Sequence, residues 1–226
     1  MPRLGRISRV IIGFVVLSVL IICAMVPAVR QAGEAALLNA CHCRMCGMSM
    51  TLARYYEANG TYPPEYSRGA DSKRTRWKQI LEESGKVEFD LTCPTKTAAF
   101  AAVCGSGAIF DGPQAAAPDD VADGCDNTLI LIAFTLSELA RAGSPDVQLD
   151  ALSKMADSDG MFSAMSIHSG GRGLVFADCT NFRLIKPISV RTMRALLTRA
   201  GGENVTRQQL VDDGYLGRQG WYAQIP

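Results

Sequence analysis

The chain has 226 residues and nearly balanced charge, with 23 Lys and Arg against 22 Asp and Glu. A formal net charge of +1 gives no strongly basic surface, which argues against a nucleic-acid-binding protein. Outside one long apolar segment the chain is long enough for a single domain with its own core.

An uncharged segment of 20 residues spans positions 10–29. As a helix rising about 1.5 Å per residue, it is long enough to cross a hydrocarbon layer of about 30 Å. Arg3, Arg6 and Arg9 precede it, so the positive-inside rule predicts that residues 1–9 stay in the cytoplasm. A secretory signal peptide is the alternative, but its apolar core is usually only about 7–15 residues long. We therefore expect an uncleaved single-pass anchor in the inner membrane, in contact with lipid through residues 10–29.

The same helix is expected to continue outside the membrane over residues 30–58. Apolar side chains recur there at alternating steps of three and four, which places them on one helical face. They are Leu38, Cys41, Met45, Met48, Leu52 and Tyr55. Asn59-Gly60 predicts the end of the helix. We expect this face to pack on a sheet, and contact with a partner helix is the alternative.

Residues 59–226 are expected to form one α+β domain in which the long helix packs on an antiparallel sheet. The strongest strand signal is the apolar, β-rich run at 128–134. Further strands are predicted at 87–93, 165–167, 173–177 and 182–185, helices at 76–83, 147–155 and 189–199, and either strand or helix at 98–104. The segment 61–76 reads as a turn-rich connection, and the tail after Gly202 reads as weakly structured.

Eight cysteines are present, and Cys23 lies in the membrane segment. The others are Cys41, Cys43, Cys46, Cys93, Cys104, Cys125 and Cys179. An extracytoplasmic compartment permits disulfides, and an odd number leaves at least one thiol free or paired between molecules. The pairing cannot be read from sequence, although Cys93 with Cys104 is the most local choice.

The segment 41–46 concentrates three of these cysteines around His42. A c-type haem site is excluded because Gly47 stands where the histidine after Cys46 is required. Zinc lacks a second ligand pair at finger spacing, and a redox dithiol at Cys43 and Cys46 lacks a thioredoxin-like context. We expect no cofactor. A membrane-tethered ligand- or metal-binding module using Cys41 to Cys46 is the alternative function.

Five separate blocks of sequence, at 27–36, 55–64, 123–131, 168–178 and 196–203, each carry a different motif, and together they point the same way. The most specific parts are Asp123-Gly124 followed by Asn127-Thr128, and His168 followed by Gly170-Gly171 and Asp178. In order and content the blocks resemble the bacterial type IV pilin-like, or prepilin-like, family with a domain of unknown function. The resemblance implies a pilin-like fold and a structural role for these residues. It also implies partners among other pilin-like subunits or secretion-type machinery.

The chain departs from that family in three places. The family carries a Glu five residues after its processing site, but the two possible registers place Val10 or Ser18 there. Cys179 replaces the Gly of the Asp-Gly pair, and Asp126 replaces a Ser. The missing Glu argues against processing by a prepilin peptidase.

His168 and Asp178 allow two interpretations. A catalytic one makes His168 a base oriented by Asp178, but the sequence contains no nucleophile motif. A structural one has the pair bracing a hairpin through a hydrogen bond. We favour the structural one and expect no enzyme activity. A calcium site formed by Asp123, Asp126 and Asp178 is a further alternative, although no loop has EF-hand spacing.

Overall fold

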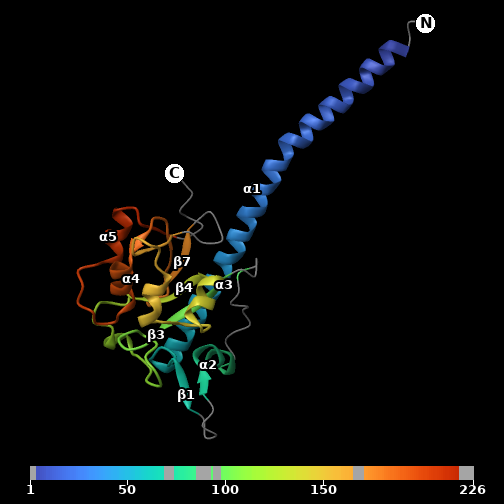
Figure 1. Cartoon of the computed structure of the whole chain (residues 1–226). Helices are drawn as coiled ribbons and strands as arrows, with labels where there is room; N and C mark the ends of the chain where they lie inside the picture. The colour runs from blue at the N-terminus through green and yellow to red at the C-terminus, as the bar shows by residue number, and fades with distance from the viewer. Residues whose placement is uncertain (1–3, 69–73, 85–92, 94–97, 165–170, 219–226) are drawn as a thin grey trace. The chain divides into compact units, whose positions relative to one another are not determined.

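The computed structural model describes residues 4–68, 74–84, 93, 98–164 and 171–218 (Figure 1). The chain divides into two compact units, Met1–Asn39 and Ala40–Pro226. The second unit combines helices with a sheet whose strands are mostly antiparallel, so the α+β class is confirmed.

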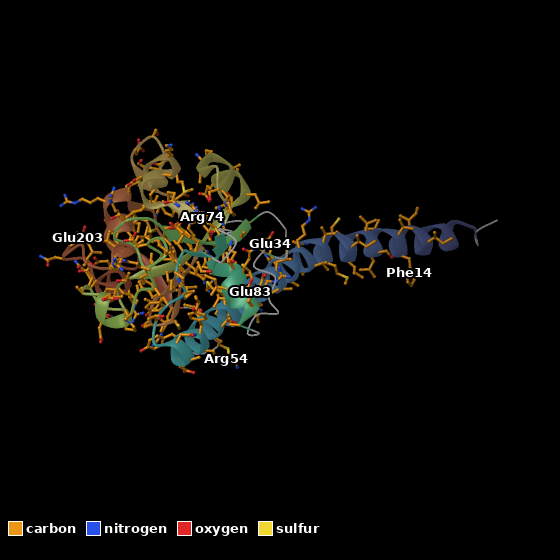
Figure 2. The ribbon with its side chains drawn as sticks, turned by 90° about the horizontal axis from the view of Figure 1, so that it is seen from below. Phe14, Glu34, Arg54, Arg74, Glu83 and Glu203 are labelled. Carbon is orange, nitrogen blue, oxygen red and sulfur yellow. The ribbon has the colours of Figure 1, made fainter. Side chains whose placement is uncertain are left out.

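Helix α1 (Leu4–Asn59) is continuous and contains Pro27. Within it, Ile11–Asn59 includes a stretch with a mean hydropathy of 2.8, which makes this helix a candidate membrane span. The apolar side chains of residues 11–29 are exposed all around the helix, as with Phe14 at 69% (Figure 2). Because no protein surface covers them, lipid is the environment that suits their chemistry.

The part of α1 within the second unit has a different character. Met45, Met48 and Leu52 are at most 1% exposed and belong to a buried cluster, and Cys41 and Tyr55 pack against it. The predicted apolar face is therefore confirmed for these residues as a face that packs in the domain. Asn59 ends the helix, and Gly60 follows with a φ of 71°.

The central sheet has six strands in the order β10-β8-β7-β4-β3-β5. Their bounds are β3 Ala98–Cys104, β4 Leu129–Thr135, β5 Val147–Gln148, β7 Arg172–Phe176, β8 Asn181–Leu184 and β10 Leu216–Arg218. All neighbours pair antiparallel except β3 with β5. Two small sheets pair β1 (Tyr66–Arg68) with β2 (Arg74–Arg76), and β6 (Met161–Phe162) with β9 (Ile188–Ser189).

The strands send alternate side chains to two separate cores, as a period of two requires. Leu174 of β7 joins one core, while Val175 joins the core that contains the α1 residues. A register shift in β4 between Leu129 and Leu131 places Ile130 and Leu131 together on the α1 side. Such a bulge inserts one unpaired residue and so allows two neighbours to share a face.

Short helices complete the domain. They are α2 (Trp77–Glu83), η1 (Pro118–Asp120), α3 (Leu136–Ala142), η2 (Leu149–Met155), α4 (Val190–Leu197) and α5 (Arg207–Asp212). Met193 and Leu196 of α4 and Leu210 of α5 fill the core on the sheet face opposite α1, and both helices lie beside the strands in Figure 1. The sheet of the second unit is thus covered on both faces.

Most predicted elements are present, with three corrections. The segment 98–104 forms the strand of its two predicted alternatives, whereas a hairpin of β1 and β2 lies in the supposed connection. The predicted helix 147–155 is a two-residue strand followed by a 3-10 helix. The tail is structured, because α5 covers the core and β10 adds a strand to the sheet edge. Residues 87–92 of one predicted strand, and 165–167, lie outside the described residues.

The sequence analysis also missed α3 and a buried ion pair beneath it. Thr135 caps α3: its Oγ1 accepts from Glu138 N at 3.2 Å, and Glu138 Oε2 accepts from Thr135 N at 2.8 Å. The Thr-x-x-Glu spacing is the sequence signal of this reciprocal cap. Arg172, 1% exposed, donates to both carboxylate oxygens of Glu138 at 2.7 and 3.0 Å.

Candidate functional site

A loop before β4 positions Cys125. Gly124 adopts a φ of 90°, which glycine tolerates without strain, and its carbonyl accepts from Asn127 N and from Thr128 Oγ1, both at 3.0 Å. Gly124, Asn127 and Thr128 thus form one hydrogen-bonded turn.

The turn between β7 and β8 positions Cys179. Its N–H donates to Phe176 O at 2.9 Å, and Phe176 N donates to Thr180 O at 3.0 Å. Cys179 has a φ of 63°, the only positive φ outside glycine in the described part of the chain. A side chain at this backbone conformation costs free energy, so the surrounding hydrogen bonds must hold the turn in place.

The loop and the turn meet. Asp178 N donates to Cys125 O at 3.0 Å, and Ala177 N donates to Thr128 O at 2.8 Å. A cavity of about 330 Å³ lies at this junction; we call it the Cys125–Cys179 pocket. It is lined by Tyr62, by Ala53, Tyr56 and Glu57 near the end of α1, by Pro118, and by Cys125, Ala177, Asp178 and Cys179.

Each thiol of the pocket approaches one of two polar groups that are hydrogen-bonded to each other, the Tyr62 hydroxyl and the Ala177 carbonyl. The Tyr62 hydroxyl donates to Ala177 O at 2.9 Å and lies 3.4 Å from Cys125 Sγ. The Cys179 thiol donates to the same carbonyl at 3.8 Å. The Tyr62 ring stacks on Tyr56 with centroids 5.8 Å apart, which supports the hydroxyl in this position.

The electrostatics of the pocket favour a protonated Cys179 thiol. Burial, the Asp178 carboxylate and Cys125 raise the pKa of Cys179 to about 11. Burial and the nearby Cys125 raise the pKa of the Tyr62 hydroxyl as well. Because the thiolate is the reactive form, Cys179 is a poor nucleophile at neutral pH.

Asp178 acts as an anchor for α5. Its Oδ2 accepts from Arg207 at 2.7 Å, and its Oδ1 accepts from Thr180 N at 3.0 Å. The Arg207 guanidinium also lies over the rings of Phe176 and Phe182, at 5.0 and 5.1 Å. The expected partner, His168, lies outside the described residues together with Gly170.

Gly171 is described, and its place explains the residue type. It has a φ of 94°, and a Cβ there would run into the carbonyl oxygen of Leu184. The strand before the β7–β8 turn therefore begins where only glycine fits without rearrangement.

Asp123 and Asn127 tie the loop to the C-terminal part of the domain. The Asp123 carboxylate accepts from Gly201 N at 2.7 Å and from Gly202 N at 3.1 Å. Asn127 Oδ1 accepts from Arg207 N at 2.8 Å. Asp123 and Asp178 thus have separate partners, and within the described residues no group of three or more metal-ligating side chains gathers, so a calcium site has no support there.

The segment 41–46 separates its side chains. The Cys41 thiol forms a hydrogen bond with the buried Cys93, and burial followed by the effect of Cys93 raises the Cys41 pKa to about 12. Cys46 Sγ lies 3.4 Å from His42 Nε2 and accepts from Asn181 Nδ2 at 3.4 Å. Burial raises the Cys46 pKa despite the Asn181 hydrogen bond. Cys43 is exposed.

All eight cysteines are thiols and not disulfides in the structure. The local pairing of Cys93 with Cys104 is wrong for this state, because Cys93 interacts with Cys41 on α1 instead. Cys104 is buried in the core on the α1 side, and burial raises its pKa. His42 and Cys46 are two of the ligands that zinc needs, but a metal centre usually requires three or four. The described residues supply no third one.

No protein-family model, curated protein or solved structure matches the chain.

Proposed function

We propose that this chain is a membrane-anchored, pilin-like protein whose domain lies outside the cytoplasm and works by assembly or interaction. Its proposed partners are other pilin-like subunits or secretion-type machinery. The proposal assigns it no catalytic step. The raised pKa values of Cys41, Cys46 and Cys179 support that part, because each disfavours the thiolate that a redox enzyme uses.

The observation that carries the proposal is the two-part chemistry of α1. Residues 11–29 expose apolar side chains and carry no charge, whereas Met45, Met48 and Leu52 are buried in the domain core. A single helix that suits lipid at one end and a sheet face at the other is what an anchored, pilin-like subunit needs. The three N-terminal arginines favour an N-terminus on the cytoplasmic side of the inner membrane.

A first experiment tests the placement. Cys43 is exposed, so a membrane-impermeant maleimide should label it in cells whose outer barrier is permeabilised and whose inner membrane is intact. A Cys43→Ser variant is the matched control for labelling of other thiols. Labelling of Cys43 only after the inner membrane is broken would place the domain in the cytoplasm and overturn the proposal.

A second experiment tests assembly. A photo-reactive residue is placed at Leu17, in the apolar segment, or at Ile185, on the domain, since each wild-type side chain is 55% exposed. In native membranes we expect protein adducts with a second copy or another membrane-anchored subunit. Lipid adducts alone at Leu17, together with no protein adduct at Ile185, would refute a role in assembly or interaction.

A further inference from the structure

The Cys125–Cys179 pocket contains two cysteines from segments 54 positions apart in the chain. The backbone brings them together, because Asp178 N, next to Cys179, donates to Cys125 O at 3.0 Å. The Cys125 thiol lies 3.4 Å from the Tyr62 hydroxyl, and the Cys179 thiol lies 3.8 Å from the Ala177 carbonyl that this hydroxyl binds. Neither thiol is assigned a role by the pilin-like proposal itself.

The conformation of Cys179 gives an independent reason to look for a role. At a φ of 63° glycine is unstrained, while any other residue costs about 1–2 kcal/mol per residue in left-handed backbone. A cysteine at this position is therefore unfavourable by local propensity. A disulfide, which only cysteine can form, offsets such a cost.

We propose that Cys125 and Cys179 form an intramolecular disulfide that joins the loop before β4 to the β7–β8 turn. The structure shows the reduced form, and both cysteines line the same cavity of about 330 Å³. The disulfide closes a large loop, which restricts the unfolded chain, and it holds the strained turn in place. The inference rests on the proposed extracytoplasmic placement, because an oxidising compartment supplies the disulfide donor.

The chemistry is thiol–disulfide exchange with a disulfide donor such as glutathione disulfide or an oxidised dithiol protein. One cysteine thiolate attacks the donor, forms a mixed disulfide and releases one donor thiolate. The second cysteine thiolate attacks the mixed disulfide, forms the Cys125–Cys179 bond and releases the other donor thiolate. The two cysteine protons pass through solvent to the two released thiolates, so two thiols are oxidised and one disulfide is reduced.

The decisive measurement is disulfide mapping of the full chain. Protein from native membranes is alkylated without reductant and digested with trypsin and a protease that cleaves before aspartate. Aspartates between Cys104 and Cys125, at 111, 119, 120 and 123, then place the two on separate peptides. We expect a peptide containing Cys125 linked to the peptide containing Cys179. Linkage of either cysteine to a different cysteine overturns the proposal, and alkylation of both overturns it unless the purified, re-oxidised chain forms the link.

The same mapping on purified full chain, reduced in detergent and then equilibrated with glutathione buffers, tests the pair apart from the compartment. Failure to form the Cys125–Cys179 link there overturns the disulfide. Formation there, with both thiols alkylated in protein from cells, supports the pair as a site and contradicts the extracytoplasmic placement. The two ideas can therefore fail separately.

A pair of variants gives a second readout. Under oxidising conditions Cys179→Gly and Cys179→Ala should each lower Tm by roughly 5–15 °C, because both lose the cross-link. Under reducing conditions Cys179→Gly should leave Tm unchanged or raise it, because glycine relieves the strained φ, while Cys179→Ala retains the strain. Equal Tm differences under both conditions would show that no disulfide contributes.

Discussion

The buried ion pair of Arg172 and Glu138 gives the sharpest test of how the domain is held together. The side chains are 1% and 9% exposed, and two hydrogen bonds join them at 2.7 and 3.0 Å. Arg172 also donates to Ser163 O at 3.0 Å and to Ala133 O at 2.9 Å, so one side chain links three segments. Replacing it strands a buried carboxylate.

Arg172→Met should therefore lower the free energy of unfolding by about 3–5 kcal/mol, the usual cost of breaking a buried pair by removing one partner. The double variant Arg172→Met with Glu138→Leu removes both charges. It should cost less than Arg172→Met alone, because only the α3 cap, worth about 1 kcal/mol, and some backbone bonds are then lost. The matched control is Arg194→Met, whose exposed pair with Asp150 at 3.9 Å should contribute about 0–1 kcal/mol.

Urea denaturation of the full chain in detergent, followed by far-UV circular dichroism, measures these differences. A loss below about 1 kcal/mol for Arg172→Met would show that the pair is not buried as described. Costs that simply add in the double variant would show that the two side chains do not interact.

The pair also predicts a pH dependence. Burial alone would raise the pKa of Glu138, but Arg172, by hydrogen bonding and charge, and the hydrogen bonds from Thr135 outweigh it and lower the pKa. A lowered pKa in the folded state stabilises the fold above the carboxyl's ordinary pKa of 4.5, and this contribution is lost as the pH falls through the folded value. Glu138→Gln should flatten the stability profile in this acidic range, and an unchanged slope would contradict the assignment.

Four further predictions concern the anchor, the domain without it, the loop before β4 and the thiols. N-terminal sequencing of membrane-extracted protein should find an unprocessed start, and a processed start would contradict this expectation. Residues 30–226 without the anchor should show a cooperative thermal transition. A disordered circular dichroism spectrum from the oxidised protein would contradict that. Asp123→Ala should lower the free energy of unfolding by about 1.5–3 kcal/mol, because two N–H groups lose a charged acceptor. Asp126→Ala, at an exposed position, should lower it far less, and equal losses of stability would refute the anchoring role of Asp123. In the reduced chain, iodoacetamide should react with exposed Cys43 much faster than with Cys41. The Cys41 alkylation rate should rise about tenfold per pH unit toward its pKa of about 12. Equal alkylation rates of Cys41 and Cys43 at neutral pH would contradict the described burial.

The raised pKa of Cys179 and the proposed disulfide are compatible. A half-buried, protonated thiol exchanges slowly, so the Cys125–Cys179 bond should form while the chain folds and its thiols are still exposed. Once formed in the pocket, it should resist reduction for the same reason. The pocket therefore suits a structural cross-link better than a catalytic dithiol.

Local sequence patterns determined the parts of this protein that depend on neighbours along the chain. The uncharged run at 10–29, the three-and-four spacing of Met45, Met48 and Leu52, and the apolar run of β4 each carry their own periodicity. Helix α3 had a local signal too, since Thr135 and Glu138 have capping-box spacing, but its seven residues are too short for a periodic pattern.

Only the tertiary structure decided which residues meet across the chain. Cys41 with Cys93, Arg172 with Glu138, and Asp178 with Arg207 are separated by 29 or more positions, and no spacing rule links them. The tail after Gly202 reads as polar because α5 buries only Leu210 and β10 is an edge strand held by backbone pairing with β8. Backbone hydrogen bonds and long-range contacts leave almost no trace in composition, and for that reason the sites of this domain emerge only when the sheet is assembled.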